Sequence, residues 1–233
     1  MLPPTITNTS GINTSGTTIR EFTMSVTADE RTQLANLFDD VGPDAPTLCG
    51  DWTTRDLVAH LLVRERRPDA ALGILVPALA GRTERVMSTV ARREYPDLVH
   101  EFRLGPPFWS PLGWPVIGDQ ANLFEFFVHH EDVRRAQPEW QPREDDLTRD
   151  DALWKSLRLA SKMLFRQSPV GVVLSSAGRA DIVAKKGDPF VTLVGLPGEI
   201  ALLGFGRSPE LARVVIEGTP DHVAAFVSSD RGL

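Results

Sequence analysis

The segment FEFFVHHEDVRR, residues 124–135, determines how the first part of the chain can fold, because it mixes ionisable and aromatic side chains. Successive side chains on a helix lie about 100° apart. With Glu125 taken as zero, His129 falls at about 40° and Asp132 at about −20°, so the three share one face. Apolar residues flank that face, which is therefore predicted to point into a helical bundle. The residues predicted to face the rim or solvent are His130, Glu131 and Arg134.

A buried charged face needs a partner, and a metal ion is the partner that this pattern favours. Glu125 and His129, four residues apart, can reach one ion. A third ligand must come from a facing helix, where His60 lies at the edge of an apolar stripe. Two imidazoles and one carboxylate are a common set for a divalent metal, usually zinc, with a position left open for water or substrate. Asp132 could accept the other ring N–H of His129, or join the set itself.

Each of these residues also has a purely structural interpretation. His60 could be a core histidine bonded to the backbone, and Glu125 with His129 could be a buried salt-bridged pair. A rotated helix would present His130 in place of His129. Cys49, just before the second predicted helix, could be a metal ligand, a nucleophile or a small buried hydrophobic residue.

Arg64 lies one turn beyond His60, in the charge-rich run RERRPD. One interpretation makes this run a solvated helix end. The other places Arg64 at the mouth of a pocket, where its charge would attract an anionic substrate.

Composition narrows the class of protein. The chain has 233 residues, enough for one large domain or two small ones, and 42% of them are apolar. A net charge of −6 argues against nucleic-acid binding, which needs a basic surface. The single cysteine excludes an internal disulfide and is typical of a reducing cytoplasm. No apolar run is long enough for a membrane span.

The ends of the chain differ in pattern from its middle. Residues 1–23 are rich in Thr, Ser, Asn and Gly, lack the features of a secretory signal, and are expected to be disordered. Helical patterning begins just after Met24, which is therefore an alternative translation start. After Pro169 the helical period gives way to short Val- and Thr-rich runs.

This change in pattern predicts an α-helical bundle over residues 24–167 and a small α+β module over 168–233. Thr27 with Glu30, and Thr53 with Asp56, have the spacing of capping boxes at two helix starts. The predicted helices are 27–41, 53–69, 70–80, 82–102, 118–136, 149–166, 199–206 and 220–229. The predicted strands are 171–177, 179–187, 189–195 and 211–218, the first three antiparallel. The loop 105–119, with Trp109 and Trp114, either lines a pocket or is pinned to the core.

Two motifs together resemble the DinB-like metal-binding superfamily. The segment GDWTTRDLVAHL follows the pattern W-[ST]-x-[RK]-D-[LV]-x-x-H-L, and Glu125, His129 and Asp132 form a later E-x-x-x-H-x-x-D. Within the superfamily, the chain is most similar to the mycothiol-dependent maleylpyruvate isomerase N-terminal family of actinobacteria. The resemblance implies a four-helix bundle with His60, Glu125 and His129 as the zinc ligands. Residues 63–82 and the loop 105–119 differ and indicate a distinct metal-binding subfamily.

The resemblance also implies a function. A metal-bound low-molecular-weight thiol such as mycothiol would attack a small electrophilic substrate, as an isomerase or a transferase. The end of the chain looks like the small C-terminal domain of these isomerases, which often contributes an arginine near the active site. Arg207 is the candidate here, and with Arg64 it would bind substrate carboxylates. The alternatives are a metal-dependent hydrolase and a non-enzymatic metal or ligand-binding protein. The expected protein is a cytoplasmic monomer or homodimer.

Overall fold

The computed structural model describes residues 25–67, 69–70, 80–110, 112 and 115–229, without side-chain detail for 115–121. The disordered segment expected over residues 1–23 lies outside this range, as do most of the helix expected at 70–80 and Trp114. No helix within the described residues is long and apolar enough to span a membrane.

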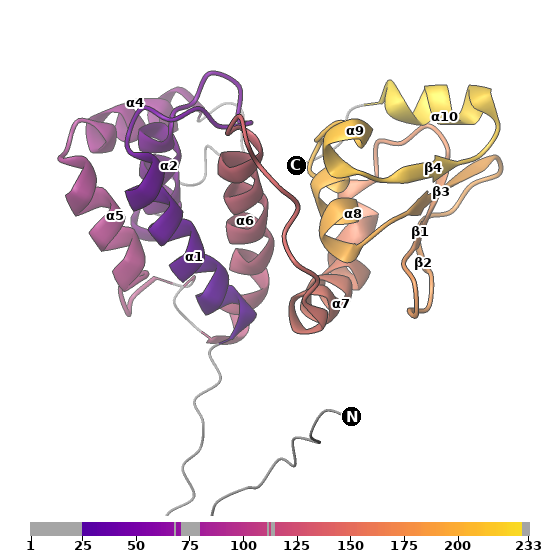
Figure 1. Ribbon diagram of the computed structural model, residues 1–233, viewed down its shortest axis with the longest axis horizontal. Helices are drawn as coiled ribbons and strands as arrows, with labels where there is room; N and C mark the ends of the chain where they lie inside the picture. The colour runs from indigo at the N-terminus through magenta and orange to yellow at the C-terminus, as the bar shows by residue number, and fades with distance from the viewer. Residues whose placement is uncertain (1–24, 68, 71–79, 111, 113–114, 230–233) are drawn as a thin grey trace, which may run out of the picture.

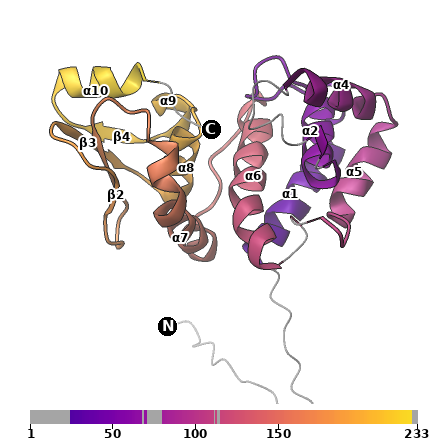
Figure 2. The ribbon, with the colours of Figure 1, turned by 180° about the vertical axis from the view of Figure 1, so that it is seen from behind.

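Two lobes lie side by side (Figures 1 and 2). The first lobe is helical: α1 (Val26–Val41), α2 (Thr54–Arg66), α4 (Ala80–Ala91), α5 (Tyr95–Leu104) and α6 (Pro115–Arg135). The second contains α7 (Leu147–Leu164), β1 (Gly171–Ser175), β2 (Ile182–Lys185), β3 (Phe190–Val194), α8 (Pro197–Gly204), α9 (Pro209–Ala212), β4 (Val215–Glu217) and α10 (Pro220–Val227). The predicted fold class, a helical bundle followed by a small α+β module, is confirmed.

A four-helix bundle forms from α1, α2, α5 and α6, whose apolar faces share one buried cluster. Phe38, Leu61, Phe102 and Phe126 contribute one large side chain from each helix, and none is more than 1% exposed. The amphipathic spacing of the sequence therefore buries the predicted faces.

The starts of two helices test the capping predictions. Thr53 caps α2 and forms the predicted box with Asp56. The prediction for α1 is wrong, since Ser25 caps that helix by accepting from the backbone N–H of Ala28 at 3.2 Å. Glu30 is instead buried, with partners far away in the sequence.

The sheet has the strand order β2-β1-β3-β4. The prediction of three antiparallel strands is wrong for one pair, because β1 and β3 are parallel while β1–β2 and β3–β4 are antiparallel. The chain leaving β2 passes very close to the start of β1, where a Cβ on Gly171 would lie 2.5 Å from the carbonyl oxygen of Gly187. Only glycine at position 171 allows this crossing, a tertiary requirement that strand patterning does not reveal.

Helix α7 packs with the sheet. Leu153, Trp154 and Leu157 belong to the same buried cluster as Val172 and Leu193. The predicted bundle extended to residue 167, so this packing leads us to propose that the domain boundary lies in the connector 136–146.

Helix α6 contributes to both hydrophobic clusters. Phe126 and Val133 lie in the cluster of the bundle, whereas Phe124, Phe127 and Val128 lie in that of the second lobe. The predicted candidate ligands of α6 therefore lie on the helix that joins the two lobes.

Candidate metal centre

The three side chains proposed from the sequence as ligands, on α2 and α6, lie together at one largely buried point. His60 Nε2 lies 3.1 Å from Glu125 Oε1, and His129 Nε2 lies 3.4 Å from the same oxygen. The two imidazole rings are 5.5 Å apart, centroid to centroid. His60 is fixed partly by Trp52, whose ring centroid lies 5.2 Å away.

The spacing of these atoms fits a metal ion. Two ligand bonds of about 2.1 Å at a tetrahedral angle separate the ligand atoms by about 3.4 Å. All three ligand atoms lie within 4.8 Å of one another. A set of two imidazoles and one carboxylate also matches the chemistry of zinc and similar divalent ions. The residues present therefore fit the metal that the sequence predicted.

Hydrogen bonds join the imidazoles of His60 and His129 to Glu125 when no metal is bound. A carboxylate only accepts hydrogen bonds, so the nitrogen of each imidazole that faces Glu125 must carry a hydrogen. Burial by itself would raise the pKa of Glu125, but Arg64 and hydrogen bonds from His129 and His60 outweigh it and hold that pKa well below its usual range. Glu125 is therefore ionised at neutral pH, as a ligand for a cation must be.

The two histidines differ in protonation. Burial lowers the pKa of His60, and its bond to Glu125 does not fully offset this effect. Burial would also lower the pKa of His129, but hydrogen bonds with Asp132, Cys49 and Glu125 raise it well above the usual value. Both ring nitrogens of His129 face a carboxylate, which explains this difference.

Asp132 lies behind His129, on the side of the ring away from Glu125. Its Oδ2 is 3.0 Å from His129 Nδ1, and its side chain is fully buried. Arg207 donates from Nε to Oδ1 at 2.8 Å and from Nη2 to Oδ2. The guanidinium thus binds the Asp132 carboxylate through two parallel hydrogen bonds, a fork that is the strongest geometry for an arginine–carboxylate pair.

Cys49 completes the surroundings of Asp132. Its thiol donates to Asp132 Oδ2 at 3.2 Å and lies 3.6 Å from His129 Nδ1. Cys49, His129 and Asp132 also have the spacing of a metal-binding group. Arg207 already supplies the positive charge at that position, so the Nε2 side of His129 is the better place for a cation.

Arg64 lies next to Glu125, with its Nε 3.4 Å from Oε2, and it also donates to Asn122 at 2.6 Å. A pocket of about 490 Å³ opens beside the centre, between α2 and α4. The residues that line it include Trp52, Asp56, His60, Thr83, Glu84 and Met87. His60 therefore belongs both to the centre and to the wall of a cavity that a small molecule could enter.

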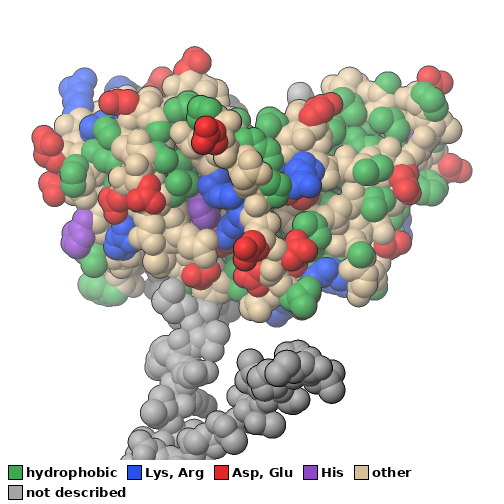
Figure 3. Space-filling model, in the orientation of Figure 1, with side chains coloured by type: hydrophobic (Ala, Val, Ile, Leu, Met, Phe, Trp, Pro, Cys, Tyr) green, Lys and Arg blue, Asp and Glu red, His purple; other side chains and the backbone are tan. Residues whose placement is uncertain are grey.

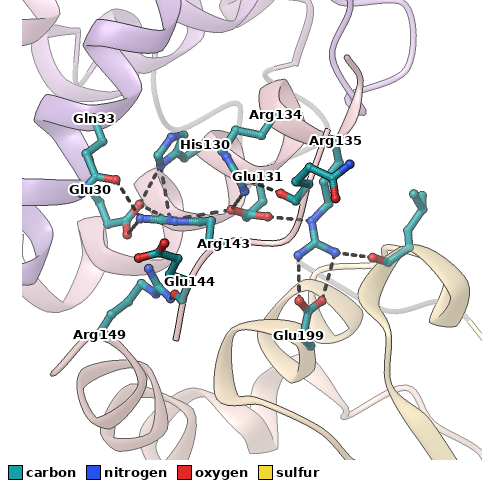
Figure 4. Close-up of polar contacts among 12 residues, drawn as sticks. Glu30, Gln33, His130, Glu131, Arg134, Arg135, Arg143, Glu144, Arg149 and Glu199 are labelled. Carbon is teal, nitrogen blue, oxygen red and sulfur yellow. Dashed lines mark hydrogen bonds and ion pairs between the residues drawn. The ribbon is translucent and has the colours of Figure 1, made fainter. Parts of the chain in front are cut away.

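The alternative ligand His130 lies elsewhere. Its Nδ1 is 2.9 Å from Glu30 Oε2, in a separate cluster. The prediction that His130 and Glu131 face the rim or solvent is wrong, because they are 5% and 1% exposed. Their partners, shown in Figure 4, come from α1, from α6 itself and from the connector after α6.

The residues that fix α6 to its surroundings are not evident from the sequence. Arg135 pairs with Glu199 of α8, and Arg143 pairs with Glu30 of α1. Nothing in the local spacing marks these residues, because each partner is more than 60 positions away. Cys49 is only weakly marked in the sequence as a site residue, by its position just before the capping box of α2.

Fold and site define a class of protein: a helical bundle with an imidazole–carboxylate–imidazole centre, closed on one side by a small α+β domain. Residues 27–107 match the family described as the mycothiol maleylpyruvate isomerase N-terminal domain. The predicted resemblance is confirmed for this part of the chain, which contains His60 and ends before α6. Searches among curated proteins and solved structures gave no match.

Proposed function

We propose that this protein binds a divalent metal, zinc in the first instance, and uses it with a low-molecular-weight thiol to modify a small electrophilic substrate. The observation that carries the proposal is the convergence of His60 Nε2 and His129 Nε2 on one oxygen of Glu125. The family match adds mycothiol as the thiol to test first.

The residues of the centre would have different roles in this function. His60, Glu125 and His129 would hold the metal, and Asp132 keeps the His129 ring turned so that Nε2 faces Glu125. A bound divalent metal would supply the charge that lowers the pKa of a thiol and keeps it as the reactive thiolate. Arg64 offsets the charge of Glu125 and lies close enough to help to orient an anionic group.

The pocket between α2 and α4 would receive the substrate next to His60. Its Trp52 and Met87 offer apolar contact, and the hydroxyl oxygen of Thr83, whose hydrogen is donated to the carbonyl of Ala70, can accept a hydrogen bond. Such a lining suits a small molecule with both apolar and polar parts. The reaction class supported is addition of the thiolate to an electrophilic carbon. This addition leads either to a stable conjugate or, after reversal, to an isomerised substrate.

Elemental analysis followed by a thiol-dependent screen tests the proposal. The purified chain is expected to contain about one zinc or similar ion. Electrophiles should then be turned over with mycothiol and zinc together, but not when either is omitted. Turnover without thiol would favour a metal-dependent hydrolase. A protein that binds metal but turns over no electrophile under any of these conditions would be a binding protein, and the proposed activity would be wrong.

A further inference from the structure

The buried carboxylate of Asp132 draws its partners from three parts of the chain. His129 is on the same helix, Cys49 is in the loop before α2, and Arg207 comes from the second lobe. Arg207 supplies a permanent positive charge, and it does so through two nitrogens. Without it, Asp132 would be a buried anion balanced only by His129.

Arg207 is itself held firmly. Its backbone N–H donates to the carbonyl of Leu202 at 3.0 Å, which closes the end of α8. Its Nη1 donates to the carbonyl of Phe205 at 2.6 Å. The guanidinium therefore extends from the carboxyl end of α8, and the position of α8 determines where the guanidinium lies.

The other end of α8 is fixed to the same helix of the bundle. Glu199, in the first turn of α8, accepts from Arg135 through both carboxylate oxygens, at 3.0 and 2.9 Å. Arg135 lies one turn after Asp132 on α6. Gly198, beside Glu199, packs directly on Phe127 of α6. Helix α8 is thus tied to α6 by one ion pair at each end, with close packing beside one of them.

A wider set of charges supports the Arg135 end (Figure 4). Arg135 also donates to Glu131 at 2.7 Å, and Glu131 lies 3.7 Å from Arg143. Arg143 reaches Glu30 of α1 at 2.8 Å. In the space-filling view, charged side chains gather along the seam between the lobes (Figure 3). The seam is therefore joined by paired charges as well as by apolar packing.

We propose that the second lobe is part of the metal centre, with Arg207 as a positioning residue that fixes Asp132 and, through it, His129. The Arg135–Glu199 pair is the second fixing point, which keeps α8 where Arg207 can reach Asp132. This inference rests on the proposed function, because it assigns the two pairs a role in metal binding. It also changes the role predicted for Arg207, whose fork is occupied by Asp132 and not open to a substrate.

Zinc affinity of the full-length chain tests the inference, measured by competition with a chromogenic chelator. Arg207→Gln should bind zinc more weakly than wild type, by no more than the about 10- to 100-fold expected for loss of Asp132, the direct partner of the proposed ligand His129. Arg207→Lys, which keeps the charge but not the fork, should recover part of that loss. Glu199→Gln should weaken binding less. Adding it to Arg207→Gln should cause little further loss, because both act through Asp132.

Two control variants separate positioning from general destabilisation. Glu210→Gln changes an exposed glutamate near Arg207 and should leave zinc affinity unchanged. Val172→Ala removes buried apolar atoms from β1 and should lower the unfolding midpoint without lowering zinc affinity. The absorption spectrum of the cobalt-substituted protein should change in Arg207→Gln and not in Val172→Ala, because only the first alters the support of His129.

The possible failures are distinct. If wild type binds no zinc or cobalt, the proposed function is wrong and this inference falls with it. If wild type binds zinc and folded Arg207→Gln binds it equally well with an unchanged cobalt spectrum, this inference alone is wrong. Should Arg207→Gln not fold, Arg207→Lys and Glu199→Gln decide the question by the same two measurements.

Discussion

His129 Nδ1 lies 3.0 Å from Asp132 Oδ2, and this contact determines which ring nitrogen of His129 remains for a metal. Because Asp132 accepts at Nδ1, the Nε2 atom faces Glu125 and His60 across the bundle. The carboxylate is fully buried, so it is held at that place by its partners and not by water. The geometry of the centre therefore depends on a residue that need not touch the metal.

Replacing Asp132 by Asn tests this dependence. The variant keeps the size of the side chain but loses the charge that holds the imidazole and the guanidinium of Arg207. We expect zinc affinity to fall about 10- to 100-fold, as is usual for partners of a metal-bound histidine. A chelator competition assay on the folded variant measures the loss, and unchanged affinity would show that Asp132 does not support the centre.

Loss of a proposed ligand should have a larger effect. His60→Ala and His129→Ala should each abolish stoichiometric metal binding, because two protein ligands rarely hold zinc tightly. His100→Ala provides the matched control, because His100 is exposed on α5. This variant should retain full metal occupancy. Elemental analysis after dialysis gives the answer. Full occupancy in both ligand variants would contradict the assignment.

Glu30 should make stability depend on pH. Burial would raise its pKa from 4.5, but hydrogen bonds from His130 and Arg143 outweigh burial and lower the pKa to about 2. A pKa that is lower in the folded state adds stability above pH 4.5, and this contribution disappears as the pH falls towards 2. A shift of this size corresponds to about 3 kcal/mol of unfolding free energy.

Glu30→Gln should accordingly be less stable than wild type at pH 7, by about 3 kcal/mol, and the difference should shrink towards pH 2. Urea unfolding at several pH values between 2 and 7 measures this difference. The exposed Glu94 provides a control, because Glu94→Gln should retain the wild-type pH dependence. A difference between wild type and Glu30→Gln that does not vary with pH would contradict the proposed ion pairing.

Gly198→Ala tests the close contact between the lobes. A Cβ at this position would lie 2.5 Å from Cζ of Phe127, so helix α8 or the ring must move. Overpacking of this kind costs about 1–3 kcal/mol. Gly81→Ala in α4 is the matched control, because its Cβ would meet no atom of the described residues within 4 Å and alanine favours the helix. Denaturant unfolding of both variants should show a loss of stability only for Gly198→Ala.

The sequence predicted the parts of the site that depend on local spacing. Glu125, His129 and Asp132 share a helix face at any tertiary arrangement, and the capping box at Thr53 and Asp56 fixes where α2 begins. His60 then falls on the apolar side of α2. These residues were identified because helical periodicity determines which of them can lie together.

Contacts between distant segments could not be predicted in this way. The partner of Glu30 is Arg143, and that of Arg135 is Glu199, pairs that only the folded chain brings together. The prediction that Glu131 is exposed to solvent is wrong in part for the same reason, because Arg143 of the connector after α6 lies 3.7 Å from it. The parallel pairing of β1 with β3 likewise depends on a close crossing at Gly171 and not on strand composition.

Helix α6 supplies side chains to the hydrophobic clusters of both lobes. A fragment cut after this helix would expose Phe124 and Phe127 to water, while a fragment that starts after it would lack part of its own interior. Although the proposed domain boundary lies in the connector 136–146, we therefore expect neither half to fold stably alone. Heating or denaturant should melt the intact chain in a single cooperative step, and a protease able to cut the connector should release no stable piece.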